Sequence, residues 1–369
     1  MEALRAADEV RVVAPVPWPR ALRGWGIGRG RGGSAHRQAG TEGEGGASTL
    51  RPIYLYPPKV LQWHYGWFMW YSVRGTVTRV LGTFRPEAVL GYWAHPDGEA
   101  ALHAARLAGI PVGLIVGGSD LLVLTHDPRR RRAVSRVLQS VDAVFPVGSA
   151  LATRAAELGV GLARIHELRQ GVDPERFSLG DPQAARKRLG AEPGVPLLLF
   201  VGNLVPVKGL EVLFEAVAQL AGRGVDFRLW LVGDGPLRRS LEKRGVALGL
   251  ASKLRFFGTQ PHGELPDFFR AADLTILSSH SEGVPNVLRE SLACGTPFVA
   301  TRVGSIAEVA TEDCELVPPG EPRALMDAIA RRLTRPRAKR SVAPYTWQES
   351  ASTVRRVLAS LIEQRRASE

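Results

Sequence analysis

Short apolar runs alternate with helix-like segments along most of this chain, and this pattern limits the folds open to it. The first series runs through a strand at 88–92, a helix at 98–108, a strand at 111–116, a helix at 130–140 and a strand at 143–147. A further helix is expected to start near Ser149. Strands that alternate with helices in this way indicate a parallel, doubly wound sheet.

A second series of the same kind follows a stretch at 171–196 that is typical of an interdomain linker. Its strands are expected at 197–201, 227–232, 254–257, 274–277, 298–300 and 315–317. The sequence therefore predicts an α/β fold with two tandem Rossmann-like doubly wound domains, at 1–175 and 176–344. Two such domains place a cleft between the carboxyl ends of their strands. A last helix within 345–369 could pack back on the first domain.

The beginning of the chain departs from this regular pattern. Residues 2–7 resemble a helix, and residues 11–17 begin as a short strand. Residues 24–48 are rich in Gly, Arg, Ser and Glu and almost lack bulky apolar side chains, which is typical of a flexible loop. A mobile flap over a site is the alternative interpretation of the same composition.

Composition limits the classes of protein to which the chain can belong. It has 369 residues, enough for two ordinary domains, and its apolar content of 45% is that of a globular protein. The two cysteines, Cys294 and Cys314, argue against a disulfide scaffold and fit a reducing compartment. The sequence shows no zinc-ligand spacing, no signal peptide and no apolar run long enough to span a bilayer.

Positive charge is the strongest bias in the composition. The formal net charge is +12, and the densest run is Arg129–Arg132, at the start of a helix-like segment. Such an excess attracts nucleotides, acidic lipids or nucleic acid, although an arginine-rich bias spread over solvated helix faces explains it equally well. Without a zinc-finger or RNP-type signature, we do not expect nucleic acid as a partner.

Residues 61–73 carry three of the eight tryptophans of the chain. An aromatic surface of this kind could enter a membrane interface or hold a lipid-linked acceptor. The buried face of a helix is the more common origin of such a stripe, and Arg74 and Arg79 continue a helix-like pattern after it. We therefore favour the core interpretation and keep peripheral membrane contact as the alternative.

Two glutamates flank a helix start in the stretch from Ser281 to Glu290. Pro285 suits the first position of that helix, so Glu282 should lie on the preceding loop and Glu290 inside the helix. Free backbone N–H groups at a helix start bind phosphate, and a carboxylate beside them can hold sugar hydroxyls. The stretch is a candidate receptor for a phosphorylated sugar.

Three further turns follow strands of the second series. Lys208 lies after a Gly turn at a helix mouth and could meet a diphosphate, although alone it is better explained as a solvated lysine. Gly233 and Gly235 allow close backbone approach, or simply form a tight turn. The segment 256–260 could line a base pocket, or belong to the core of a strand.

Taken in order, these pieces resemble the retaining glycosyltransferases of family 4, which have the GT-B architecture of two Rossmann-like domains. The resemblance is specific over about 165–320 and looser before it. The matching segments are 202–209, 232–236, 256–258, 272–273, 278–290 and 293–297, with 171–177 and 96–98 as weaker matches.

The resemblance implies a role for each matching residue. Glu290 is expected to hold the ribose hydroxyls of a nucleotide-sugar donor, Glu282 to contact the donor sugar, and Lys208 to neutralise the leaving diphosphate. A lysine and a helix N-terminus would stabilise charge that develops in the transition state. The other residues expected to bind the donor are Gly202, Asn203, Gly233, Gly258, Thr259, Gly283, Val284, Pro285, Asn286 and Val287.

The chain departs from the family pattern on the acceptor side and at its start. Asn203 stands where an arginine is frequent, and Gly117 stands where the family often has a histidine. His95, Asp97 or Asp120 could replace that histidine as the catalytic group near the acceptor. The sequence begins at what resembles the first helix of the family, without the opening strand and Gly-Gly loop, so we expect a first domain truncated at its N-terminus.

The sequence thus predicts an enzyme that moves a sugar from a UDP- or GDP-sugar to a glycan or lipid-linked acceptor, with retention, in cell-surface polysaccharide or glycolipid synthesis. It contains no Asp-x-Asp, so neither a metal nor another cofactor is expected. A cytoplasmic location is expected, with peripheral binding to the inner face of the cell membrane as an extension. The alternative functions are a catalytically impaired nucleotide-sugar-binding protein and a nucleotide-sugar epimerase.

Overall fold

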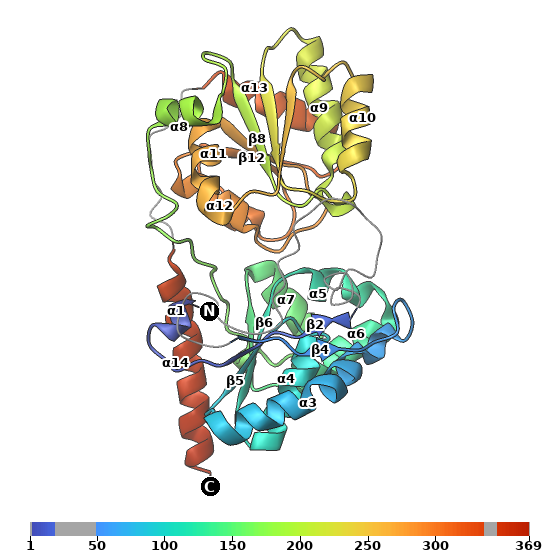
Figure 1. Cartoon of the computed structure of the whole chain (residues 1–369), viewed down its shortest axis with the longest axis vertical. Helices are drawn as coiled ribbons and strands as arrows, with labels where there is room; N and C mark the ends of the chain where they lie inside the picture. The colour runs from blue at the N-terminus through green and yellow to red at the C-terminus, as the bar shows by residue number, and fades with distance from the viewer. Residues whose placement is uncertain (1, 19–48, 336–344, 369) are drawn as a thin grey trace. The chain divides into compact units, whose positions relative to one another are not determined.

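The structure, a computed structural model, describes residues 2–18, 49–335 and 345–368, so the loop expected at 24–48 lies outside the described residues. The chain divides into two compact units, residues 1–168 with 350–369 (unit 1) and residues 169–349 (unit 2). In each unit, helices surround parallel strands (Figure 1). The α/β class predicted from the alternation of strands and helices is confirmed.

Unit 1 contains a parallel sheet in the order β5-β6-β7 and two short parallel pairs, β1-β3 and β2-β4. Residues 11–17 form two strands of two residues each rather than the single strand expected. The described elements of unit 1 are α1 (Glu2–Arg5), β1 (Val12–Val13), β2 (Val16–Pro17), β3 (Thr49–Leu50), β4 (Ile53–Tyr54), η1 (Gln62–His64), α3 (Tyr65–Phe84), β5 (Val89–Tyr92), α4 (Asp97–Ala108), β6 (Val112–Val116), α5 (Ser119–Leu122), η2 (Leu124–His126), α6 (Pro128–Ser140), β7 (Ala143–Pro146), α7 (Ser149–Glu157), η3 (Leu162–Arg164) and most of α14 (Trp347–Arg366).

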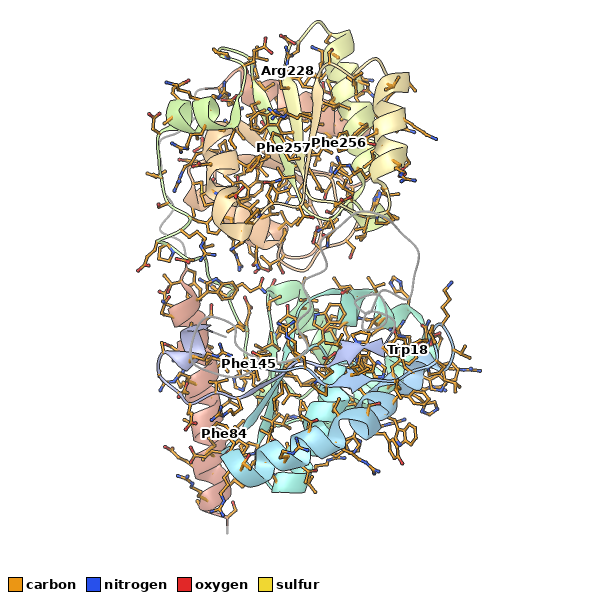
Figure 2. All side chains as sticks on the ribbon, viewed as in Figure 1. Trp18, Phe84, Phe145, Arg228, Phe256 and Phe257 are labelled. Carbon is orange, nitrogen blue, oxygen red and sulfur yellow. The ribbon has the colours of Figure 1, made fainter. Side chains whose placement is uncertain are left out.

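The C-terminal helix α14 belongs to the core of unit 1. Val354 is buried and packs with Ala143, Phe145 and Leu168. Phe145, labelled in Figure 2, lies in the sheet beside this helix. The side chain of Phe145 also needs Gly113 on the neighbouring strand, because a Cβ atom there would lie 2.7 Å from the ring. The last helix therefore covers one face of a sheet built from residues more than 200 positions earlier.

The aromatic stretch 61–73 is divided between core and surface. Its C-terminal part forms the first turns of α3, on which Met69 and Val73 are buried, 3% and 1% exposed. Trp67 and Tyr71 on the same helix are 49% and 54% exposed. The core interpretation is therefore right for one face of the helix and wrong for the other.

Unit 2 is built on six parallel strands in the order β10-β9-β8-β11-β12-β13. The order reverses between β8 and β11, because the chain first adds strands on one side of β8 and then on the other. Its described elements are α8 (Pro182–Leu189), β8 (Leu197–Val201), η4 (Pro206–Lys208), α9 (Leu210–Gly222), β9 (Arg228–Val232), α10 (Arg238–Ala247), β10 (Leu254–Gly258), η5 (His262–Glu264), α11 (Leu265–Ala271), β11 (Leu274–Leu277), α12 (Asn286–Ala293), β12 (Phe298–Thr301), η6 (Ile306–Glu308), β13 (Glu315–Val317) and α13 (Pro322–Leu333).

The stretch 171–196 is part of this unit and not a free linker. Val172, Phe177 and Ala185 are buried in one cluster with the strands β8 and β9. Arg186 on α8 donates to the carbonyl of Ala271 at 2.9 Å and pairs with the carboxylate of Asp273. A polar, Pro- and Gly-rich composition signals loops, but a few apolar side chains in it are enough to fix the segment to the core.

The loops after β8 and β11 are joined where the strand order reverses. The backbone N–H of His280 donates to the carbonyl of Val207 at 2.8 Å, and the hydroxyl of Ser278 donates to the carbonyl of Lys208 at 3.0 Å. Gly209 has a left-handed φ of 58°, and a Cβ atom on it would lie 2.2 Å from the Ser278 carbonyl oxygen. Glycine is therefore required at this junction for two separate reasons.

Substituting Gly209 tests how rigidly the two loops are joined. Gly209→Ala should lower the free energy of unfolding by more than the about 1–2 kcal/mol that a left-handed φ alone costs, because the Cβ atom also meets the Ser278 carbonyl. Gly249→Ala is the matched control, since Gly249 has a φ of 69° and nothing within 4 Å of the added Cβ. Urea unfolding gives both values, and equal losses would contradict a close junction.

Candidate active site

The donor-side residues predicted from the sequence all follow the carboxyl ends of neighbouring strands in unit 2. Parallel strands present these ends at one edge of a sheet, so the loops gather there. By strand, they are Gly202, Asn203 and Lys208 after β8, Gly233 after β9, Gly258 and Thr259 at the end of β10, and Glu282 to Val287 and Glu290 after β11.

Lys208 and Glu282 form an ion pair at the point where the strand order reverses. The Nζ atom of Lys208 lies 2.5 Å from Oε1 of Glu282, and the Ser279 hydroxyl donates to the same oxygen at 2.6 Å. The two side chains are only 20% and 12% exposed, so the ion pair lies in a place that water reaches poorly. Lys208 is therefore not the solvated lysine that its sequence context alone favoured.

The helix start beside this pair is one residue later than expected. Pro285 is the N-cap of α12 with an extended backbone and ψ of 120°, whereas the sequence placed it at the first helical position. Proline fits either position because neither needs its N–H. The loop in front of α12 is fixed by Gly304, where a Cβ atom would lie 2.1 Å from the Glu282 carbonyl oxygen.

The remaining donor-side residues differ in how accessible they are. Asn203 and Thr259 are exposed, and Val284 is buried. Among the described residues, the buried Oδ1 atom of Asn286 has no hydrogen-bond partner, although Asn286 opens α12. A buried acceptor without a partner costs free energy, so its presence at the helix start marks a place where a ligand donor could be accommodated.

Glu290 is held by a histidine that sequence reasoning missed. The Nε2 atom of His262 lies 3.0 Å from Oε1 of Glu290, and Nδ1 of His262 lies 3.0 Å from Nη1 of Arg176. Because an arginine can only donate, Nδ1 accepts and the neutral ring donates through Nε2 to the carboxylate. Burial raises the pKa of Glu290 above its ordinary value, and the contact with His262 offsets part of this rise.

Two signals in the sequence could have drawn attention to the missed residues. His262 follows the end of β10, at the same edge of the sheet as the predicted site residues. Ser279 lies inside the matching stretch at 278–290, where no role was given to it. Neither signal shows which residue is contacted, because both contacts depend on the conformation of loops. His262 and Glu290 are 28 residues apart in sequence, and Ser279 and Glu282 are 3 apart.

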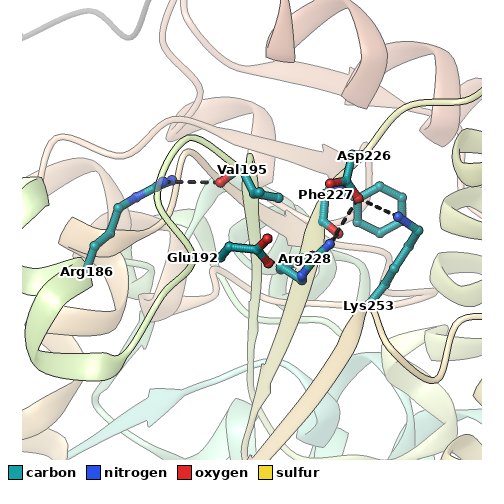
Figure 3. A network of polar contacts seen from close by, with 7 residues as sticks. All are labelled: Arg186, Glu192, Val195, Asp226, Phe227, Arg228 and Lys253. Carbon is teal, nitrogen blue, oxygen red and sulfur yellow. Dashed lines mark hydrogen bonds and ion pairs between the residues drawn. The ribbon is translucent and has the colours of Figure 1, made fainter.

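A cavity of about 250 Å³ lies at the opposite, amino end of the same strands. Its cations already have partners (Figure 3). Arg228 lies 3.0 Å from Asp226 and also pairs with Glu192, and Lys253 lies 2.6 Å from Asp226. Ligands of doubly wound sheets bind at carboxyl ends. We therefore assign the candidate site to the carboxyl edge of the sheet.

Phe256 and Phe257 are partly buried and pack against the cores of unit 2. The Phe257 ring packs 4.8 Å from Trp230 and 4.9 Å from Phe268 between ring centroids. Both phenylalanines lie along the sheet of unit 2 in Figure 2. This packing fits the strand-core interpretation of the two rings, and a base pocket lined by this segment stays a prediction.

In unit 1, the three candidates for acceptor chemistry follow β5 and β6. Asp120 is fully buried, and its carboxylate accepts hydrogen bonds from the backbone N–H groups of Ala94 at 3.1 Å and Gly118 at 2.9 Å. His95 is also fully buried, and burial with nearby Arg130 lowers the pKa of His95 to about 4. These two residues therefore hold the loops together and are poor candidates for contact with an acceptor.

Asp97 differs from the other two because its carboxyl group is partly accessible and unusually basic. It lies in the first turn of α4 and is of intermediate burial. Burial, with the charge of Asp120 nearby, raises the pKa of Asp97 to about 6. A carboxylate with a pKa in this range can take up a proton near neutral pH.

Gly117 is the position at which the histidine of the family is absent. A Cβ atom there would lie 2.8 Å from the hydroxyl of Tyr92, so the tyrosine occupies the space of a larger side chain. Burial and the charge of Asp120 raise the pKa of Tyr92. The space that a larger side chain at position 117 would fill is thus taken by the Tyr92 hydroxyl.

In the described parts of the chain, no three or more His, Cys, Asp and Glu side chains are grouped so that they could hold a metal ion. Within residues 2–18, 49–335 and 345–368, no helix combines the length and the apolar character needed to cross a membrane.

Asp97→Asn separates the stability cost of this carboxylate from any catalytic role. Because the folded-state pKa is raised, ionisation destabilises the fold as pH rises from about 4 to 6. We expect Asp97→Asn to increase the free energy of unfolding by about 1–3 kcal/mol at pH 7.5 and hardly at all at pH 4. Urea unfolding at both pH values measures this, with exposed Glu9→Gln as control. A pH-independent difference would contradict the shifted pKa.

Comparison with known proteins agrees with this arrangement. Residues 181–359 match the family Glycosyl transferases group 1. The D-inositol 3-phosphate glycosyltransferase 2 of Catenulispora acidiphila is 32% identical over 269 residues, which cover 67% of this chain and 63% of that protein. The chain therefore spans less than two thirds of that relative. TuaC of Bacillus subtilis, a teichuronic acid biosynthesis glycosyltransferase, is 30% identical over 78% of this chain and 71% of that protein.

Solved structures show the same architecture. HepE of Anabaena, determined in complex with UDP-glucose, superposes with a TM-score of 0.64 at 20% identity and covers 86% of this chain and 85% of its own. At this identity the likeness shows the fold, which is the GT-B arrangement of two Rossmann-like units. The relatives and the family match lead to one conclusion: the chain belongs to the Glycosyl transferases group 1 family.

Proposed function

We propose that this protein transfers a sugar from a UDP- or GDP-sugar to a glycan or a lipid-linked acceptor, with retention and without a metal ion. The acceptor would belong to a cell-surface polysaccharide or glycolipid. The single observation that carries the proposal is the Lys208–Glu282 pair beside the start of α12. TuaC is named as a glycosyltransferase of teichuronic acid biosynthesis, and HepE was solved in complex with UDP-glucose, which supports the same class of substrates.

The donor would bind across the carboxyl edge of the sheet in unit 2. Glu290, inside α12, would accept hydrogen bonds from both ribose hydroxyls once His262 moves aside. The diphosphate would lie between Lys208 and the N–H groups that open α12, because both favour negative charge. Glu282, already next to Lys208, would accept hydrogen bonds from the sugar hydroxyls.

The reaction breaks the bond between the anomeric carbon and the diphosphate oxygen. The electron pair of that bond stays on the diphosphate, and the acceptor oxygen forms the new bond to the anomeric carbon. Lys208 and the N-terminus of α12 stabilise the growing charge of the diphosphate more in the transition state than in the ground state. These protein groups would serve in place of a metal ion.

The proton of the acceptor hydroxyl must leave as the new bond forms. Of the three candidates in unit 1, Asp97 fits this role best because its carboxyl group is partly accessible and its pKa is about 6. The carboxylate of Asp120 already accepts two backbone N–H groups, and His95 has no exposed surface. Loss of turnover in Asp97→Asn at normal or increased stability would support this assignment.

A second candidate function is nucleotide-sugar binding without transfer. The packing of Tyr92 against Gly117 favours it, because the position of the histidine in related enzymes is filled by other atoms here. The donor half of the site would be the same in both cases. Binding of a donor without turnover, insensitive to Glu282→Ala, would identify this function.

Transfer is tested by incubating the full chain with a panel of UDP- and GDP-sugars and measuring release of UDP or GDP.

Glu290→Gln should weaken nucleotide binding about 10- to 100-fold, as expected for lost hydrogen bonds to a charged group. Lys208→Met should reduce turnover about 100-fold or more, as for other residues that stabilise transition-state charge. Exposed Lys243→Met is the control. If no nucleotide or donor binds, the proposed function is wrong.

The contact between His262 and Glu290 predicts a pH effect on nucleotide binding. Removing the imidazole should raise the pKa of Glu290 further, because the contact with His262 lowers it. A protonated Glu290 accepts hydrogen bonds from the ribose less well. As the solution is acidified, His262→Ala should therefore lose affinity for UDP or GDP at a higher pH than the wild type does. Titration calorimetry over a pH series that reaches the loss of affinity of both proteins measures the midpoints. His262→Gln keeps a donor and should restore part of the shift, and His126→Ala in unit 1 should not change it. Coincident wild-type and His262→Ala profiles would contradict the role.

A further inference from the structure

Two motifs that the donor site does not use lie next to each other in unit 1. The arginine run 129–132 opens α6, and the aromatic stretch 61–73 forms η1 and the start of α3. The guanidinium of Arg129 lies 4.5 Å from the ring centroid of Trp63, and Arg130 donates to the side chain of Gln62 at 2.9 Å. Segments nearly 70 residues apart in sequence thus meet where η1 contacts the start of α6.

This surface exposes an unusual amount of apolar and aromatic area. Val60 and Leu61 are 58% and 41% exposed in front of η1, and Trp67 and Tyr71 are about half exposed on α3. The rings of Trp67 and Tyr71 stack at 5.4 Å, and the guanidinium of Arg74 lies 4.1 Å from the Tyr71 centroid. The exposed rings are therefore held in place rather than free to fold inward.

The charge around these rings is positive. Residues 49–86 contain no aspartate or glutamate, and they contain five cations, namely Arg51, Lys59, Arg74, Arg79 and Arg85. On α6, Arg129, Arg131 and Arg132 are exposed. The carboxylate at this helix start, Asp127, is engaged with the backbone N–H groups of Arg129 and Arg130 at 2.8 and 2.9 Å.

We propose that this surface, called here the α3–α6 surface and formed by residues 59–61, Trp67, Tyr71, Arg74 and 129–132, binds anionic lipid bilayers. Trp and Tyr favour the boundary between headgroups and acyl chains, where one side of the ring is apolar and the other is hydrated. Arginines and lysines beside them are attracted to the negative surface of an anionic leaflet. A bilayer satisfies both parts of the surface at once.

The combination of residues favours lipid over the other anionic partners. Exposed aliphatic side chains such as Val60 and Leu61 gain little from contact with phosphate groups alone, but they gain from burial among acyl chains. A lipid-linked acceptor lies at a bilayer surface, so lipid binding would bring the enzyme to its acceptor. This link between lipid binding and catalysis rests on the proposed function. Binding itself needs neither donor nor acceptor, so it can be measured separately.

Sedimentation of the full chain with vesicles tests the α3–α6 surface. We expect binding to vesicles of phosphatidylcholine with 30% phosphatidylglycerol, little binding to phosphatidylcholine alone, and weaker binding as salt rises from about 0.05 to 0.5 M. The pair Arg131→Gln/Arg132→Gln should reduce the vesicle affinity about 30-fold, as expected for two cations at an anionic surface. Trp67→Ala/Tyr71→Ala should reduce it at least about tenfold and leave UDP or GDP binding unchanged.

Matched variants elsewhere on the surface complete the experiment. Leu162→Ala removes an apolar side chain that is 78% exposed, and Arg239→Gln/Lys243→Gln removes two exposed cations from α10. These controls should keep wild-type vesicle binding. Circular dichroism should show the same folded spectrum for all variants, because every substituted side chain is exposed.

Three results would overturn the inference. Wild-type protein that does not bind the anionic vesicles at low salt would exclude the lipid surface, whether or not the protein binds nucleotides. Controls that lose as much binding as the α3–α6 variants would show a non-specific effect of charge. A change from dimer to monomer in Trp67→Ala/Tyr71→Ala, measured by light scattering without lipid, would show that a second copy covers this surface. By contrast, vesicle binding without nucleotide binding would support the lipid surface and reject the transferase.

Discussion

The ion pair between Lys208 and Glu282 is the interaction on which the candidate site depends. Each residue follows one of the two strands between which the order of the sheet in unit 2 reverses. Neither charge is well exposed, so each needs the other as long as no ligand is bound. The pair therefore fixes the positions of two loops. It also places a cation and an anion side by side, where a nucleotide-sugar is proposed to contact both.

Backbone packing makes this pairing possible. The loops meet through hydrogen bonds from His280 and Ser278, and Gly209 allows a carbonyl to approach where any Cβ atom would collide. The junction of the two loops thus rests on main-chain groups and on the hydroxyl of Ser278. The contact of His262 with Glu290 fixes the position of the second carboxylate. The contacts that fix the loops and the side chains of the candidate site thus lie at the same carboxyl edge of the sheet.

Much of this arrangement could be predicted from the sequence, because buried parallel strands are continuous apolar runs that end in glycine turns. The strands of unit 2 and the place of Glu282, Glu290 and Lys208 follow from that pattern. Contacts between distant loops could not be predicted, and so His262 was missed. The buried position of Phe177 could not be predicted either, because one apolar residue in a polar segment gives no sign of whether it is buried. The exact start of α12 could not be predicted, because proline suits two adjacent positions at a helix start.

The central claim is that a nucleotide binds at the carboxyl edge of the sheet in unit 2, and hydrogen exchange with and without UDP or GDP tests it most directly. We expect slower exchange in residues 202–209 and 278–290 on nucleotide binding. We expect no change in residues 190–192 and 252–255, which line the cavity at the amino end of the same strands. Protection of the amino-end cavity, with unchanged exchange around Lys208 and Glu282, would contradict it.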